Sequence, residues 1–177
     1  AINFMTSVTP SDIPFNSTAN NRAQWVFYNT DFAAAPAGNI TRIYFRRNSS
    51  MLPVINSYTN LVVKIGETNL TVLPPGPWIT ANMVTVFQAN TYDFIPVPVD
   101  WMPITLQTPF YFSGSSNFIV EVTHSGYTVG FQVMQGNLTA RSLYGGAGSV
   151  MANSQNFLCE FGFDIGVGGT DVTFEGI

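Results

Sequence analysis

Residues 157–167 read Phe-Leu-Cys-Glu-Phe-Gly-Phe-Asp-Ile-Gly-Val, and large apolar side chains recur at every second position of this stretch. A period of two is that of a β-strand with one buried face. We therefore predict one long strand here, with Cys159 and Phe163 among the side chains on its core face. Glu160 and Asp164 fall on the opposite face, where we expect solvent.

The same period recurs along the rest of the chain, and turn signals such as Pro74-Pro-Gly-Pro77 separate the repeats. No segment has a sustained period of 3.6, so long helices are not expected. About ten short strands at this spacing predict an all-β fold, namely a single antiparallel, jelly-roll-like β-sandwich over residues 13–177. The clearest further strands are residues 24–29, 42–46, 61–65, 83–88, 104–107, 118–123, 127–134 and 138–144.

The first twelve residues form an N-terminal extension with a pattern of its own. Ile2, Phe4, Thr6 and Val8 alternate with Asn3, Met5 and Ser7, and Thr9-Pro-Ser-Asp-Ile-Pro14 then breaks the pattern. An apolar strand followed by such a hinge either pairs with its own sheet or completes the sheet of a neighbouring copy. In the second case these four alternating side chains are those of a donor strand.

The scarcity of charge gives weight to exchange between copies. Only 9% of the chain is charged, against roughly 25% in an ordinary soluble domain. Natural sheet edges are commonly guarded by lysine, and this chain has one, Lys64. A surface with so little charge is often covered, either by copies of the chain or by sugar.

Composition also excludes several classes of partner. The formal net charge of −4 and a pI of about 4.6 argue against nucleic acid, which requires a basic surface. The apolar runs are far shorter than the ~20 residues of a transmembrane helix. A first residue Ala1 is what we expect of a processed secreted protein.

Five Asn-x-Ser/Thr sequons fit an extracellular or cell-surface glycoprotein. They begin at Asn16, Asn39, Asn48, Asn69 and Asn137.

Nothing in the sequence favours catalysis, and we predict no catalytic residue. The only histidine, His124, precedes a Ser-Gly turn and is expected at the surface, while the only cysteine, Cys159, reads as a buried apolar residue. The sequence lacks a Gly-x-Ser-x-Gly motif. Glu121 and Glu160 fall on outward strand positions rather than on the two sides of a cleft.

Metal ligands are equally sparse. One cysteine and one histidine exclude a transition-metal site. Calcium needs only oxygen ligands, and Asp164 with Asp171, or Asp93 with Asp100, flank loops that could supply them. We favour turn capping for these aspartates and predict no cofactor.

Glycan binding is the alternative function. Trp78 and Trp101 lie near loops, where exposed rings could stack on sugars, whereas Trp25 lies within a strand and is expected in the core.

Six segments between residues 38 and 122 share one pattern of order and spacing. They are Gly38-Asn-Ile-Thr-Arg-Ile-Tyr-Phe-Arg46, Leu61-Val-Val-Lys-Ile-Gly-Glu-Thr68, Thr85-Val-Phe87, Trp101-Met-Pro-Ile-Thr-Leu106, Thr108-Pro-Phe-Tyr111 and Ser116-Asn-Phe-Ile-Val-Glu-Val122. In these segments about half of the chain resembles a sandwich domain of secreted and surface proteins of environmental bacteria. The resemblance implies a non-catalytic extracellular β-sandwich and no catalytic residues.

The sequence therefore predicts a structural subunit of an extracellular filament or surface assembly, a homopolymer that grows head-to-tail by β-strand addition. A carbohydrate-binding module or lectin-like domain is the alternative.

Overall fold

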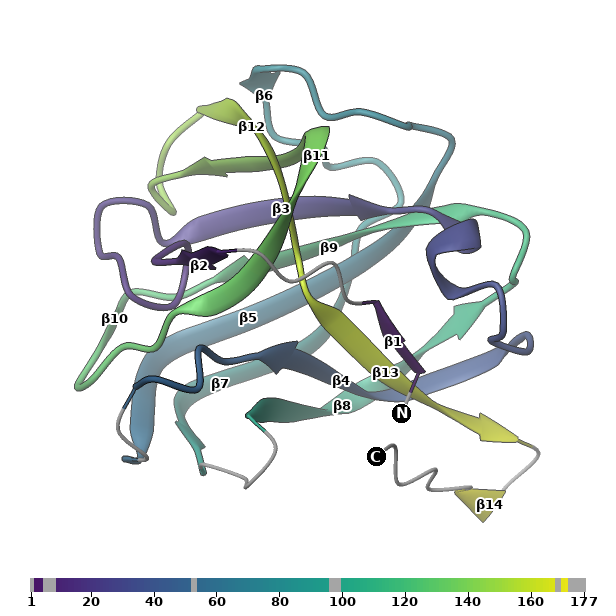
Figure 1. Cartoon of the computed structure of the whole chain (residues 1–177), viewed down its shortest axis with the longest axis horizontal. Helices are drawn as coiled ribbons and strands as arrows, with labels where there is room; N and C mark the ends of the chain where they lie inside the picture. Colours follow the sequence, from purple (N-terminus) through teal and green to yellow (C-terminus); the bar gives the residue numbers. More distant parts are fainter. Residues whose placement is uncertain (1, 5–8, 52–53, 96–99, 168–169, 172–177) are drawn as a thin grey trace.

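The structure, a computed structural model, describes residues 2–4, 9–51, 54–95, 100–167 and 170–171. Two β-sheets pack face to face (Figure 1). One sheet holds β1 (Ile2–Phe4), β4 (Gly38–Arg46), β8 (Trp101–Phe112), β13 (Phe161–Val167) and β14 (Thr170–Asp171). The other holds β2 (Thr9–Ser11), β3 (Arg22–Phe27), β5 (Asn56–Thr68), β6 (Gly76–Pro77), β7 (Val84–Phe94), β9 (Asn117–Thr123), β10 (Gly126–Tyr127), β11 (Val133–Gly145) and β12 (Met151–Cys159).

The strand order confirms the predicted all-β antiparallel sandwich. The five-stranded sheet runs β1-β13-β4-β8, with β14 also on β13, and the nine-stranded sheet runs β10-β5-β9-β3-β11-β12-β6, with β2 on β11 and β7 on β5. Neighbouring strands pair antiparallel throughout the described residues. The one described helix is a short 3-10 turn, η1 (Asn29–Phe32), and none is long and apolar enough to cross a bilayer.

Aromatic side chains fill the space between the sheets. Phe161 of β13 stacks on Phe27 of β3, with ring centroids 4.8 Å apart, and Phe15 stacks on Phe131 at 4.6 Å. All four rings are buried. Such pairs add about 0.5–1.5 kcal/mol each to the burial of their area, so the core stabilises the fold without disulfides.

The chain crosses from one sheet to the other at Glu160. Its backbone N–H donates to Met134 O of β11 at 2.8 Å, and its backbone oxygen accepts from the N–H of Arg46 of β4 at 3.3 Å. The prediction of one long strand over residues 157–167 was therefore wrong, because β12 ends at Cys159 and β13 begins at Phe161 in the opposite sheet. Leu158 and Cys159 are both buried at this corner, since each faces apolar neighbours there.

A second, smaller core covers the outer face of the nine-stranded sheet. Leu73 and Trp78, from the segment between β5 and β7, pack there with Val26, Ile119 and Leu143.

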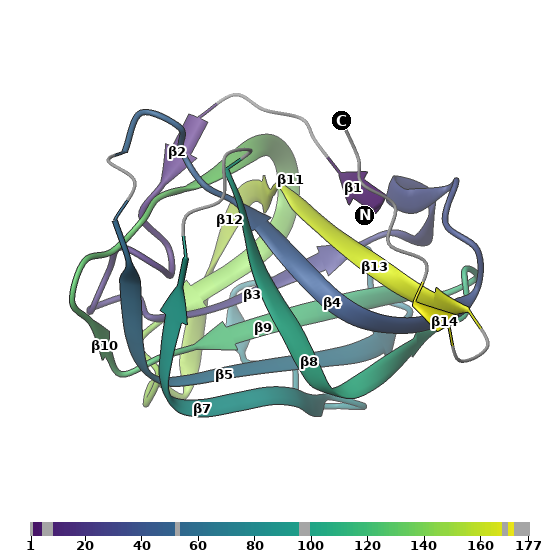
Figure 2. The same cartoon turned by 90° about the horizontal axis from the view of Figure 1, so that it is seen from below.

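The edge strands β7 and β8, one from each sheet, lie beside each other along one side of the sandwich (Figure 2). The Gln107 side chain spans this seam. Its Oε1 accepts from the backbone N–H of Gln88 at 3.0 Å, and its Nε2 donates to Gln88 O at 2.9 Å. The amide thus takes the place of a strand partner, and this pair of edges is occupied.

Candidate functional site: the groove of the first strand

Strand β1 lies along the edge of β13, where Ile2, Asn3 and Phe4 pair with Phe163, Gly162 and Phe161 (Figure 1). It is the last strand on its side of the five-stranded sheet, so its second edge has no strand partner among the described residues. A strand this short adds few backbone hydrogen bonds, and side chains must supply the rest of its affinity for the sheet.

The side chain of Phe4 supplies an aromatic anchor. Its ring makes edge-on contacts with Phe27 and Phe32, at centroid distances of 6.4 and 6.2 Å. Phe27 comes from β3 and Phe32 from η1, and both are buried. Ile2 also packs against the main core. The groove is therefore apolar, and it receives alternate side chains of the strand.

Gly162 shapes the groove between these two anchors. A Cβ at this position would overlap the side-chain oxygen of Asn3 and would lie 3.2 Å from Ile2 O. The missing side chain leaves the space that Asn3 occupies as it crosses the sheet edge. This role of Gly162 was not predicted, although a glycine inside a strand pattern is a known signal of close backbone approach.

The structure thus places two of the predicted donor residues, Ile2 and Phe4, in the groove of their own chain. Thr6 and Val8 lie outside the described residues. Thr9, Pro10 and Ser11 form β2 on β11. Both described parts of the first twelve residues are therefore paired with the sandwich.

Each positively charged side chain has a partner within the same chain. Five of the six cationic side chains have an acidic partner. Arg22 and Lys64 lie 2.9 and 4.0 Å from Glu121, Arg46 lies 2.7 Å from Glu160, Arg47 lies 3.0 Å from Asp100, and Arg141 pairs with Asp31. The sixth, Arg42, donates from its Nε to Thr105 Oγ1 at 3.2 Å. The cations therefore serve internal pairs rather than a free charged surface.

The prediction that Glu121 and Glu160 face solvent was wrong, since they are 2% and 0% exposed. Glu160 is buried at the crossing between the sheets. Glu121 is buried beneath the segment between β5 and β7, whose Ile79 backbone exchanges two hydrogen bonds with the Gln24 side chain. Gln24 Nε2 also donates to Glu121 Oε2 at 2.6 Å.

The two tryptophans proposed for glycan contact differ in their surroundings. Trp78 is 7% exposed, its Nε1 donates to Ser149 O at 2.8 Å, and the Arg22 guanidinium lies 4.3 Å from its ring centroid. It is therefore not an open stacking platform. Trp101 is half-buried at the start of β8, in register with Arg46. Trp25 is buried, as predicted.

The sequons fall into two groups. Asn39, Asn69 and Asn137 are exposed. Asn16 and Asn48 are half-buried, and their Nδ2 atoms donate to Asp12 Oδ1 at 2.8 Å and to Gln132 Oε1 at 2.9 Å.

The histidine and the cysteine occupy inert positions. His124 is 1% exposed, so the expectation of a surface residue was wrong; its Nε2 donates to Pro14 O at 2.6 Å, and burial lowers its pKa. Cys159 is 0% exposed, as predicted, and burial raises the pKa of its thiol. A buried thiol held in its protonated form is a poor nucleophile.

Of the aspartates considered for calcium, Asp93 accepts from Ser57 Oγ, Asp100 pairs with Arg47, and Asp164 accepts from Tyr44 Oη. The side chain of Asp171 lies outside the described residues. Within the described part of the chain, no three acidic, histidine or cysteine side chains group as metal ligands.

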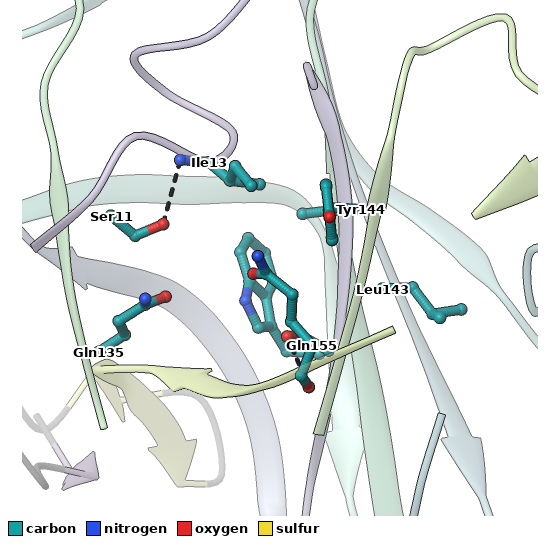
Figure 3. A pocket seen from close by; sticks show the side chains of 9 residues that line it. Ser11, Ile13, Gln135, Leu143, Tyr144 and Gln155 are labelled. Carbon is teal, nitrogen blue, oxygen red and sulfur yellow. Dashed lines mark hydrogen bonds between the residues drawn. The ribbon is translucent and has the colours of Figure 1, made fainter. Parts of the chain in front are cut away.

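Two cavities differ greatly in size. One of about 10 Å³ lies where β2 and β3 share the edge of β11, and it is lined by Ser11, Gln135 and Gln155 among others (Figure 3). It has room for about one water molecule. The other, of about 380 Å³, lies at the start of β5, between Met51, Val54, Val129 and Phe131.

No protein family, curated protein or solved structure matches this chain.

Proposed function

We propose that this protein is a structural subunit of an extracellular assembly, in which β1 of one copy occupies the β13 groove of the next. The observation that carries the proposal is the fit of Ile2–Phe4 to that groove, with Asn3 over Gly162 and Phe4 against Phe27 and Phe32. An exchanged strand would keep these contacts, because donor and groove are chemically the same in every copy.

The closed form of the subunit is the one in which β1 pairs with β13 of its own chain. When β1 leaves its own groove, the strand and the groove become free together. Head-to-tail contacts between copies then leave a free strand at one end of the row of subunits and a free groove at the other. Such a heterologous contact need not close and therefore propagates as a fibre. The internal use of the cationic side chains supports the proposal, since few charges remain to oppose contact between copies.

Two substitutions separate the donor from the groove. Gly162→Ala narrows the groove and leaves the strand intact, because its methyl group would displace the Asn3 side chain and lie 3.2 Å from Ile2 O. Phe4→Asp removes the aromatic anchor of the strand and leaves the groove intact. Gly126→Ala is the matched control, because a Cβ at Gly126 of β10 meets no atom within 4 Å. We expect fibres from the unmodified chain and from Gly126→Ala, and no fibres from either of the other variants alone.

The decisive sample is a mixture of Gly162→Ala with Phe4→Asp. One intact donor strand and one intact groove permit a single contact between the two variants. Size-exclusion chromatography with light scattering should therefore show a heterodimer and no larger species. Circular dichroism verifies that each variant is folded. If the unmodified chain stays monomeric in negative-stain images and on the column, or if Gly162→Ala assembles as Gly126→Ala does, the proposal fails.

Three exposed sequons favour a secreted, glycosylated form of this subunit. Sugar on Asn39, Asn69 or Asn137 would meet solvent, whereas sugar on Asn16 or Asn48 would compete with an existing hydrogen bond. Mass spectrometry of the protein from its native source tests this. Occupied Asn16 with unmodified Asn39, Asn69 and Asn137 would count against it.

Glycan binding is a second candidate, and Trp101 is the observation that favours it. Met102 and Ile104 are buried, so Trp101 points to the outer face of the five-stranded sheet, where Arg46 and Tyr44 also lie. A ring beside polar groups suits a sugar. Loss of glycan-array binding on Trp101→Ala, with Trp25 and Trp78 intact, would support this function; no binding by the unmodified chain would exclude it.

A further inference from the structure

The larger cavity has apolar walls and one deeply placed polar group. Its volume is about 380 Å³, and Met51, Val54, Val129 and Phe131 line it together with Asn56. Val54 and Val129 are 37% and 48% exposed, whereas Asn56 is 2% exposed, so the valines lie at the mouth and the amide lies deeper. An apolar pocket with a few well-placed polar groups is the usual form of a small-molecule site.

The amide of Asn56 has one hydrogen-bonding atom to spare. Its Nδ2 donates to Val129 O at 2.8 Å and to Gly130 O at 3.4 Å. Both acceptors are carbonyl groups, which cannot donate, so the nitrogen must face them and the oxygen must point away from them. Oδ1 is buried, and no residue in the described part of the chain forms a hydrogen bond with it. A buried acceptor without a donor is costly, so a molecule that brings a donor to it gains affinity.

The walls of the cavity are held in place by contacts within the chain. Phe131 stacks on Phe15, with ring centroids 4.6 Å apart, and Gly130 lies so close to Phe15 that a Cβ there would be 2.7 Å from Phe15 O. On the other side, Met51 Sδ accepts from the backbone N–H of Gln132 at 3.0 Å. A preformed cavity binds without the cost of ordering its own walls.

The charges beside the cavity favour a neutral ligand. Arg47 also lines it, is 5% exposed, and has its charge balanced by Asp100, whose Oδ1 lies 3.0 Å from Arg47 Nη2. The guanidinium disfavours an ammonium group nearby, because like charges repel. A carboxylate only accepts hydrogen bonds and cannot satisfy Asn56 Oδ1. A neutral hydroxyl group donates to Oδ1 without either conflict.

The volume sets the size of the ligand. An apolar cavity of about 150 Å³ holds benzene, so one of about 380 Å³ has room for roughly ten to fifteen heavy atoms. A straight-chain alcohol of medium length has this size. Its chain would lie against Val54 and Val129 and remove their exposed apolar area from water.

We infer that this cavity binds a neutral aliphatic alcohol, with its hydroxyl group on Asn56 Oδ1 and its chain between Val54 and Val129. The start of β5, where the cavity lies, is away from β1 in both views (Figures 1 and 2). The site therefore does not depend on the proposed strand exchange, and either can fail without the other.

A pair of isomers separates recognition of the hydroxyl group from simple apolar binding. Straight-chain nonanol and methyl octyl ether contain the same atoms and have similar volumes, but the ether oxygen only accepts. We expect calorimetric titration of the unmodified chain with nonanol to show a single site. Methyl octyl ether should bind about tenfold more weakly or worse, because it leaves Asn56 Oδ1 without a donor. Nonanoate and nonylammonium should also bind more weakly than nonanol.

Two variants with matched positions locate the site. Val129→Phe places a ring at the mouth of the cavity, and Val84→Phe is the control, because Val84 is also 48% exposed and pairs with Ile65 at the far end of β5. We expect Val129→Phe to abolish the binding of nonanol and Val84→Phe to leave the dissociation constant unchanged. Circular dichroism verifies that both variants are folded.

Three results would each overturn the inference. If the unmodified chain does not bind nonanol, the cavity holds water only. If methyl octyl ether binds as tightly as nonanol, Asn56 Oδ1 does not recognise the hydroxyl group. If folded Val129→Phe binds nonanol as the unmodified chain does, the alcohol lies elsewhere on the protein.

Discussion

At the scale of single residues, His124 shows how one buried ring ties distant segments together. Its Nε2 donates to Pro14 O, its backbone N–H donates to Asn21 O, and its backbone oxygen accepts from Asn21 Nδ2 at 2.6 Å. The Tyr58 and Tyr127 rings face it at 5.1 and 5.8 Å between centroids. Because Pro14 O only accepts, the proton of the neutral ring is on Nε2, and no partner of Nδ1 lies among the described residues.

This burial makes stability depend on pH in a defined direction. The pKa of His124 is lowered in the folded state, mainly by desolvation. Above about pH 6.5 the ring is neutral in both states; as the pH falls, the unfolded chain takes up a proton first, so stability declines until the folded pKa is passed. Burial raises the pKa of Tyr58, so this neighbouring ring stays neutral in this range. Each tenfold difference in proton affinity corresponds to about 1.4 kcal/mol.

The measurement is urea unfolding at about pH 7.5 and about pH 5. We expect the unmodified chain to lose more stability between these values than His124→Gln, which does not titrate and can still donate to Pro14 O. Carboxylates contribute equally to both proteins and cancel. Equal losses would contradict the prediction.

The sequence did not reveal this position or that of Glu121. A lone histidine before Ser-Gly and a glutamate at an alternating strand position both read as exposed. Their burial depends on segments far away in sequence, Pro14 for His124 and Ile79 above Gln24 for Glu121. A local period reports which side of a strand a residue faces, but not what covers that side.

At the scale of elements, the crossing from β12 to β13 places a carboxylate inside the sandwich. Glu160 is 0% exposed and accepts from Arg46 Nη1 at 2.7 Å, while its backbone bonds to both sheets. The ion pair between Glu160 and Arg46 therefore stabilises the crossing, at the point where β13 begins beside β4. Phe161 and Phe163, which follow, then face the core as the alternation predicted.

Glu160→Gln should destabilise the fold by about 1–3 kcal/mol, because a buried charge-assisted hydrogen bond is replaced by a neutral one. Glu67→Gln, on an exposed position of β5, is the matched control and should stay within about 0.5 kcal/mol of the unmodified chain. Urea midpoints of the two variants give the comparison. Equal midpoints would show that the crossing does not depend on this charge.

The elements themselves were largely predictable, and their joints were not. Alternation located most of β4, β9 and β13 and the middle of β5, because the side chains of a half-buried strand alternate between apolar and polar along the sequence. It joined residues 157–167 into one strand because a change of sheet at Glu160 leaves the period of two almost intact. The groove was half predicted: Ile2 and Phe4 were named from their alternation, whereas Gly162 and Phe32 became visible only once η1 and β13 were side by side.

At the scale of the whole molecule, the distribution of charge predicts what kind of force holds an assembly together. The cationic side chains are held by partners in the same chain, and the groove presents apolar side chains. Association between such surfaces is driven by removing apolar area from water. Long-range attraction between opposite charges has little part in it.

We therefore expect the assembly to resist salt. The fraction of protein that sediments should be the same at about 50 mM and about 500 mM NaCl, a range over which screening removes most attraction between exposed charges. Sodium sulfate at equal ionic strength should raise that fraction, because it strengthens the burial of apolar surface. The Gly162→Ala variant, in which the added methyl group narrows the groove, should stay in the supernatant throughout and so separates assembly from salting-out. Dissolution of the fibres between the two NaCl concentrations would mean instead that surface charges, and not the apolar groove, hold the copies together.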